Sequence, residues 1–372
     1  MCRLALLWFA TAACGTSPAQ PAGCPSGVLV VTSDEHNSSE VGVLPLDGSP
    51  AQLIPGSDLG GDPALSVSTA GAPFFLARDR NTIFALDWCG RGTAPYSALA
   101  PGETKADPWD LDVAADGSLW IARFLAPSML VLDKTGSPLG TVDLSSLDAD
   151  GNPNQDAVRV QQTSSGEKAF VAMERLDDTQ VGVPSTQPSQ MAIVDTKTHS
   201  LEGVVTLAGR NPFGPMIEHG GSLWLADMGN RDNDHELDAG IEVFSPETRT
   251  SHLLLSEVTL GGTLSSIALD ASSSCGAAIV YDQSPVNHTS LVAFDVSGNV
   301  VQAPAFGPTT GYDLWALEWT SDGRLLVGDH TQPPPASAGF AVHTFTHDGS
   351  CKLTREGDLF LPMQPIAFAA PR

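Results

Sequence analysis

Residues 107–146 read DPWDLDVAADGSLWIARFLAPSMLVLDKTGSPLGTVDLSS. Four short stretches in this segment have continuous or alternating apolar residues, a pattern typical of buried and half-buried strands. Turn residues separate the stretches, and Asp116-Gly117 is a strong signal for a tight hairpin between the first two. The segment therefore predicts one antiparallel unit of four strands.

The same unit recurs along the chain at intervals of 45 to 55 residues. A repeat of about this length is typical of the blades of a β-propeller. The predicted first strands begin at Asp62, Asp107, Asp156, Asn211, Thr263, Asp313 and Gln364.

The two ends of the repeat array complement each other. The stretches GVLVVTSD, VGVLPLDG and AQLIPG, from Gly27 onward, match the second, third and fourth strands of a unit. The closing stretch QPIAFAA matches a first strand. Joining the two fragments removes exposed edge strands. We therefore predict an all-β, seven-bladed propeller over residues 27–372, whose ring is closed by the C-terminal strand joining the N-terminal blade.

These residues resemble propellers of the NHL and YVTN types. The resemblance rests on Asp-Pro at two strand starts (62–63 and 107–108) and on a strand reading SLWIA or SLWLA (118–122 and 222–226). The stretch CPSGVLVVTSD, residues 24–34, is also similar to propeller lipoproteins of myxobacterial type. The resemblance implies a fold and not an activity.

The first residues, MCRLALLWFATAACG, have the features of an export signal. Arg3 precedes a ten-residue apolar run, interrupted only by Thr11, which is too short to span a bilayer, and small residues precede Cys14. This resembles a bacterial lipobox, although Thr11 stands where Leu is usual. We expect a signal peptide over residues 1–13, a lipidated Cys14 with a tether over 14–26, and export to the bacterial outer membrane, facing the periplasm or the surface. An ordinary secretory signal is the alternative.

Four cysteines remain in the predicted mature domain. An even number in an oxidising compartment favours disulfides. Cys24 and Cys275 fall where a first strand turns into a second, whereas Cys89 and Cys351 fall where a third turns into a fourth, one blade later in each case. We predict the pairs Cys24–Cys89 and Cys275–Cys351. Free or metal-bound thiols are the alternative, but no C-x-x-C pair supports zinc.

The charge of the chain excludes one class of partner. Acidic residues outnumber basic ones 43 to 18, giving a net charge of −25. Nucleic-acid binding needs a basic stripe, and the sequence contains none. Motifs for a nucleophile elbow, a zinc protease, a phosphate loop or a dinucleotide fold are also missing, so no catalytic residue is predicted.

The seven residues that begin the first strands form a candidate metal site. Their side chains are expected to encircle one end of the central channel, and hard cations such as Ca²⁺ prefer oxygen ligands. Calcium is therefore the one candidate cofactor. Gluconolactonase-type propellers hold a catalytic metal at a similar place, but the specific acids and Asn that bind it in those proteins have no match in this sequence. The candidate ligands are Asp62, Asp107, Asp156, Asn211 and Asp313. The alternative is a turn-forming role of Asp and Asn.

Three further features are expected near the same end. Asp148–Asp156 resembles a calcium loop with its Gly out of position, and Asp227–Asp238 is rich in acids. Four histidines on loops at this end suggest a second hypothesis, a shared transition-metal site: His36, His235, His288 and His330. A solvated polar surface is the alternative for both acidic loops and for the histidines. Five tryptophans in first or second strands are expected to pack between blades rather than to line a site: Trp109, Trp120, Trp224, Trp315 and Trp319.

The sequence thus favours a binding propeller in the cell envelope, anchored only by its lipid, with an envelope protein or small ligand as partner. A calcium-dependent hydrolase or lactonase is the alternative.

Overall fold

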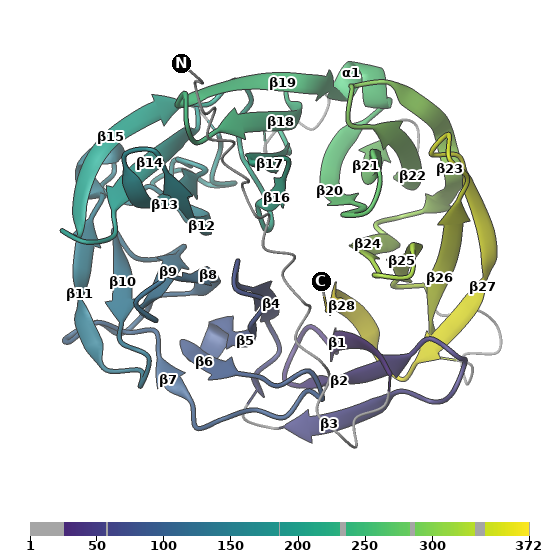
Figure 1. Ribbon diagram of the computed structural model, residues 1–372, viewed down its shortest axis with the longest axis horizontal. Helices are drawn as coiled ribbons and strands as arrows, with labels where there is room; N and C mark the ends of the chain where they lie inside the picture. Colours follow the sequence, from purple (N-terminus) through teal and green to yellow (C-terminus); the bar gives the residue numbers. More distant parts are fainter. Residues whose placement is uncertain are drawn as a thin grey trace, which may run out of the picture.

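The computed structural model describes residues 26–56, 59–185, 187–230, 236–282, 287–331 and 339–371. Seven antiparallel sheets of four strands stand around a common centre (Figure 1), which confirms the predicted propeller. The predicted signal peptide, Cys14 and nearly all of the tether lie outside the described residues.

The strands of each blade are given from the centre of the ring outward. Blades 1 to 3 contain β28 (Gln364–Ala369), β1 (Gly27–Ser33), β2 (Ser39–Pro45) and β3 (Gln52–Gly56); β4 (Pro63–Val67), β5 (Pro73–Ala77), β6 (Thr82–Ala85) and β7 (Tyr96–Ser97); β8 (Pro108–Val113), β9 (Leu119–Arg123), β10 (Ser128–Leu132) and β11 (Pro138–Asp143). Blades 4 and 5 contain β12 (Gln155–Thr163), β13 (Gly166–Met173), β14 (Gln190–Asp195) and β15 (Ser200–Thr206); β16 (Ile217–His219), β17 (Ser222–Asp227), β18 (Gly240–Ser245) and β19 (Thr250–Ser256). Blades 6 and 7 contain β20 (Thr263–Leu269), β21 (Cys275–Asp282), β22 (His288–Asp295) and β23 (Val300–Thr310); β24 (Leu314–Trp319), β25 (Arg324–Asp329), β26 (Phe340–His347) and β27 (Leu353–Leu361). Short helical turns occur at α1 (Glu257–Leu260) and at two 3₁₀ segments, Arg78–Arg80 and Ser145–Leu147.

The core lies between the faces of neighbouring blades. All five residues of β9 are buried, as expected for a strand covered on both faces. Trp120 of that strand packs in one cluster with Val158 and Val171 of the next blade. The outermost strand β15 alternates exposed and half-buried residues because only one of its faces meets a neighbour.

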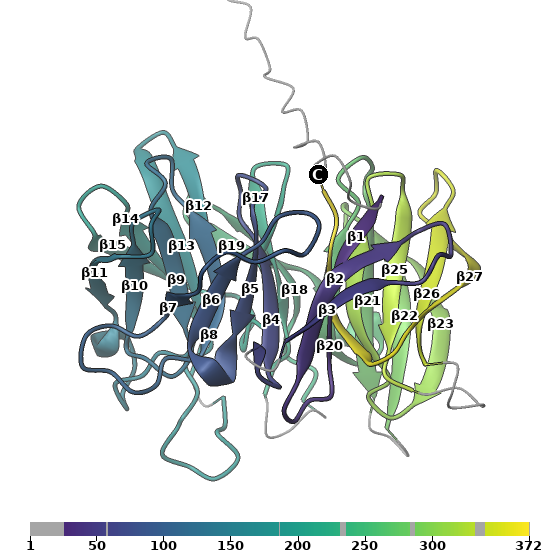
Figure 2. The ribbon, with the colours of Figure 1, turned by 90° about the horizontal axis from the view of Figure 1, so that it is seen from below.

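The ring closes through the two ends of the chain. Strand β28 pairs antiparallel with β1, from Leu29 opposite Ala369 to Ser33 opposite Gln364. Figure 2 shows that most strands stand along the axis of the ring, so the connections gather at its two ends. The end at which the innermost strands begin is called the mouth below.

One disulfide joins two neighbouring blades as predicted. Cys275, at the start of β21, is bonded to Cys351, in the turn before β27. Cys89 is also disulfide-bonded. Its predicted partner Cys24 lies outside the described residues, so that pairing stays a prediction. Among the helices in the described ranges, none combines the length and apolar character of a membrane span.

Candidate functional site

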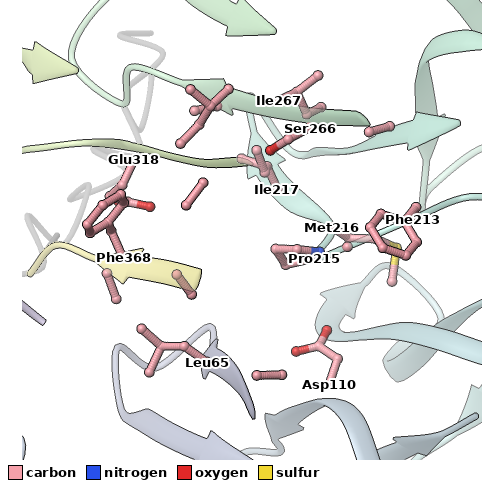
Figure 3. A pocket seen from close by; sticks show the side chains of 18 of the residues that line it. Leu65, Asp110, Phe213, Pro215, Met216, Ile217, Ser266, Ile267, Glu318 and Phe368 are labelled. Atoms are coloured by element: carbon pink, nitrogen blue, oxygen red, sulfur yellow. The ribbon is translucent and has the colours of Figure 1, made fainter. Parts of the chain in front are cut away.

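A cavity of about 1010 Å³ occupies the centre of the ring. The innermost segments of all seven blades contribute to its wall. Much of this wall is hydrocarbon, and Figure 3 shows Leu65, Ile217, Ile267 and Phe368 around the open space. The channel therefore offers a largely apolar surface to a ligand.

A buried ion pair forms the polar part of the wall in blades 3 and 4. Asp110 Oδ2 lies 2.6 Å from Nη1 of Arg159, and it accepts a hydrogen bond of 3.0 Å from the Val158 N–H. The Ser66 hydroxyl donates to the other carboxylate oxygen. Burial raises the pKa of Asp110, and the Arg159 charge opposes this rise. Both charges of the pair are satisfied, which such a buried position requires.

Arg78 crosses the mouth between two residues of the predicted ring. Its Nη1 lies 2.8 Å from Asp62 Oδ1, and its Nε lies 2.9 Å from Asp107 Oδ1. The guanidinium also lies over the indole of Trp109. The Arg78 N–H donates to the Asp62 carbonyl, which fixes the backbone at the end of β5. An arginine thus joins two acids that sequence reasoning assigned to a metal.

Asp156 and Asn211 are two other ring residues, and both are about 1% exposed while lining the cavity. Neither carboxylate oxygen of Asp156 has a hydrogen-bond partner within the described chain, and nor does Oδ1 of Asn211. Burial raises the pKa of Asp156 well above its usual range, and the nearby carboxylate of Glu174 adds to the rise. The Gly214 N–H faces the carboxyl and opposes this effect, but it forms no hydrogen bond of ordinary geometry.

The remaining ring residues are at the expected strand starts. Thr263 begins β20, Gln364 begins β28, and Asp313 directly precedes β24. Across the ranges that the structure describes, no group of three or more Asp, Glu, His or Cys side chains is placed to hold a metal. The backbones of Asp107 and Asn211 are left-handed, with φ of 54° and 57°. Asp and Asn tolerate that conformation best, so turn geometry explains both residues.

The acidic loop 148–156 is held together by its own hydrogen bonds. Asp150 accepts from the N–H groups of Asn152 and Asp178. The side-chain amides of Asn152 and Asn154 both donate to the Asp178 carboxylate. Asp148 lies 3.4 Å from the Arg175 guanidinium. The carboxylates of Asp148, Asp150 and Asp178 therefore have partners without a bound ion, whereas Asn152 Oδ1 and the Asp156 carboxylate at the end of the loop have no hydrogen-bond partner in the described chain.

The predicted histidine group is not assembled among the described residues. His330 Nε2 lies 2.9 Å from the Pro365 carbonyl, and His288 Nδ1 lies 3.2 Å from the Thr309 carbonyl. His36 is exposed, and His235 lies outside the described residues. Two of the four imidazoles thus bond to the backbone.

The tryptophans divide into two groups. Trp120 and Trp224 are buried within clusters between blades, as predicted. Trp319 packs in a cluster between blades 6 and 7, as predicted, and also borders the channel, whereas Trp109 and Trp315 line the channel, which differs from the expectation. Trp109 and Trp315 each stand two residues after a ring residue, and side chains two apart on a strand share a face. This two-residue spacing is the feature of the sequence that could have placed Trp109 and Trp315 on the channel wall.

A second set of buried acids lies in and beside blade 5. Glu242 accepts hydrogen bonds from the N–H groups of Ala208 and Gly209. Burial is the main cause that raises the pKa of Asp227 well above its usual range, and the negative charge of Glu242 raises it further. Burial raises the pKa of Glu257 to about 7, although the N–H groups of Leu264 and Ala239 donate to its carboxylate and oppose this.

The comparisons with known proteins support the fold. No protein-family model matches the chain, and no curated protein matches it in sequence. A putative 6-phosphogluconolactonase from Bacteroides uniformis is similar in structure, with a TM-score of 0.59 and 13% identity over 92% of this chain and 98% of that one. A second, from Bacteroides fragilis, has a TM-score of 0.53 and 14% identity over 92% and 96%.

Hydrazine synthase from Kuenenia stuttgartiensis is also similar, with a TM-score of 0.56 and 9% identity over 82% of this chain and 87% of that one. These neighbours differ in the activities that their names describe, and their identities are low. What they share with this chain is the propeller, so the predicted resemblance holds at the level of the fold. The finer resemblance to NHL-type propellers and myxobacterial lipoproteins has no matching family model.

Proposed function

We propose that the protein binds a small amphipathic molecule in its central channel. The cavity of about 1010 Å³ has the size of a ligand site, and its apolar wall with a few polar groups is the usual composition of such sites. The observation that carries the proposal is that Asp156, a buried carboxyl group without a hydrogen-bond partner in the described chain, lines this cavity. An empty apolar cavity needs no such group.

The proposal is tested by filling the channel. Ser266 lines the cavity on β20 (Figure 3), and replacing it with Trp adds a large side chain to the wall. A neutral solvatochromic dye should bind the wild type and Ser266→Ala, and lose most of its affinity for Ser266→Trp. Equal binding to all three proteins, with melting temperatures unchanged, contradicts the proposal.

A calcium-dependent hydrolase is the second candidate, favoured by the oxygens of Asp156 and Asn211 that lack hydrogen-bond partners. Carboxylate and amide oxygens are ligands of Ca²⁺. Bound ion must stabilise the folded state by mass action. Millimolar CaCl₂ should therefore raise the melting temperature of the wild type and not that of Asp156→Asn. No shift in the wild type removes this candidate.

Export as a lipoprotein is also a proposal, and it rests on the segment ending at Cys14. More than one acyl chain gives stable membrane anchoring. Mass spectrometry of the protein purified from a bacterial membrane fraction should show an acylated N-terminal Cys14. An unmodified N-terminus at another residue contradicts lipidation, and Cys14→Ala provides the control.

A further inference from the structure

We infer that Asp156 receives an organic ammonium group, whose charge favours the ionised carboxylate with release of its proton to solvent, and that the ligand of the channel is a primary amine on a hydrophobic body. The inference deepens the proposed function and rests on it. It names the chemical class of the ligand and the residue that selects this class.

The carboxyl group of Asp156 is placed for a ligand. Asp156 stands near the start of β12 at the mouth and is one of the residues that line the cavity, and the residue is about 1% exposed. A carboxylate can accept about four hydrogen bonds. Neither oxygen accepts one within the described residues. A buried acceptor in this state destabilises the protein unless a donor reaches it from the channel.

Two arginines that line the channel are paired with acids other than Asp156. Arg159 pairs with Asp110, and Arg78 pairs with Asp62 and Asp107. Glu174 adds a further buried carboxylate beside Asp156. Neither arginine is therefore paired with Asp156. A ligand cation is attracted by the Asp156 carboxylate, whereas a ligand anion is repelled by it.

Asn211 provides a second acceptor on the next blade. Its Oδ1 has no hydrogen-bond partner among the described residues, and the residue is about 1% exposed at the channel wall. An ammonium group has three donors and no acceptor. It suits a set of oxygen acceptors better than a hydroxyl group does, because a hydroxyl brings one donor only.

Aromatic rings line the same part of the channel. The rings of Trp109 and Phe213 are 5.3 Å apart between centroids. Aromatic faces attract cations, most strongly when water is excluded. The guanidinium of Arg78 already lies on Trp109, so the mouth holds a cation against this ring.

The apolar wall accounts for the rest of the ligand. Beyond the mouth the channel presents Leu65, Ile267 and Phe368 (Figure 3). Hydrocarbon placed there leaves water, with a gain that grows with its buried area. A ligand with an ammonium at one end and hydrocarbon at the other matches both parts of the channel.

The test compares three probes of equal length by isothermal titration calorimetry at neutral pH: octylammonium, octanol and octanoate, below their micelle concentrations. The wild type should bind octylammonium roughly tenfold more tightly than octanol, and octanoate most weakly, because charge-assisted hydrogen bonds are stronger than neutral ones. Asp156→Asn should remove this preference and leave octanol binding unchanged. Asp322→Asn, which removes an exposed acid from the turn between β24 and β25, is the matched control.

A second variant keeps the test decisive if Asp156→Asn does not fold. Asn211→Asp retains a residue that tolerates the left-handed backbone and adds a carboxylate, so octylammonium should bind more tightly and octanol equally. Equal binding of octylammonium and octanol by the wild type overturns the ammonium assignment and leaves the channel function standing. Binding of none of the probes overturns both. Calorimetric binding of CaCl₂ that is lost in Asp156→Asn overturns the amine in favour of a metal ion.

Discussion

The guanidinium carbon of Arg78 lies 3.6 Å from the centroid of the Trp109 ring. The same guanidinium is paired with the carboxylates of Asp62 and Asp107. The mouth therefore contains an aromatic ring and two acids around a planar cation that the chain itself supplies. A ligand cation at Asp156 experiences the positive field of this arginine, which already influences the Asp156 carboxyl.

Arg78→Gln should strengthen the binding of octylammonium. Removal of one charge near the site is worth about 1 kcal/mol in a partly hydrated channel, which corresponds to roughly a fivefold lower Kd. Octanol binding should not change. Arg80→Gln, an exposed neighbour in the same 3₁₀ segment, is the control. If Arg78→Gln binds octylammonium more weakly than the wild type, the ammonium group of the ligand does not lie beside Asp156.

The ion pair of Asp110 and Arg159 provides a prediction on stability. Asp110→Ala leaves Arg159 buried without its partner, and we expect a loss of about 3 kcal/mol or more in the free energy of unfolding. The double variant Asp110→Leu, Arg159→Met removes both charges and should lose clearly less. Urea denaturation measures both values. A double variant that loses as much as the sum of the single changes contradicts an interaction between the two residues.

Glu257 should make stability depend on pH. Its pKa is about 7 in the folded protein against 4.5 for an unperturbed glutamate. The folded state therefore binds more protons between these pH values, and the unfolding free energy falls as the pH rises from 4.5 to 7 and then levels off. The fall from this residue is about 3 kcal/mol.

The measurement for Glu257 is the difference in unfolding free energy between the wild type and Glu257→Gln at several pH values. Glutamine loses one acceptor for the N–H groups of Ala239 and Leu264, which shifts the difference by a constant amount. The wild type should lose stability relative to the variant between pH 5 and pH 8. A difference that is the same at both pH values contradicts the raised pKa.

The disulfide between Cys275 and Cys351 should stabilise the junction of blades 6 and 7. The bonded residues are 76 positions apart. In the chain-entropy model, closing a loop of this length stabilises the folded state by about 4 kcal/mol. The double Ser variant should accordingly unfold at a lower temperature in the absence of reductant. If the free energy of unfolding falls by less than about 1 kcal/mol, the unfolded chain gains little conformational freedom when the disulfide is absent.

The sequence predicts the fold well because the repeat is regular. Asp107 directly precedes β8 as predicted, whereas the innermost strand of blade 5 begins at Ile217 and not at Asn211. A left-handed backbone selects Asp and Asn at both positions, and the residues two positions later, Trp109 and Phe213, line the channel. The position of the Trp109 side chain follows from strand geometry. Its role was missed because a tryptophan in a strand packs equally well between blades, as Trp120 does.

The polar part of the site was not predictable from spacing. Arg78 directly follows the second strand of its blade, and only the curvature of the ring brings it to the acid that precedes the first strand of the next blade, Asp107. Asp110 and Arg159 are 49 positions apart, and the pattern of neither strand specifies that the two side chains meet. The surroundings of Asp156, including the absence of a hydrogen-bond partner among the described residues, depend on such contacts, so the sequence identifies the residue and not its environment.

The most direct measurement is a crystal structure of the protein bound to 8-bromooctylammonium, with the bromine located by anomalous scattering. We predict the ammonium nitrogen at about 3 Å from a carboxylate oxygen of Asp156, the usual distance of a charge-assisted hydrogen bond. The alkyl chain should lie along the apolar wall, and the bromine between Leu65 and Phe368. Bromine on the outer surface with no ligand density in the channel contradicts the proposal, as does an ammonium group placed away from Asp156.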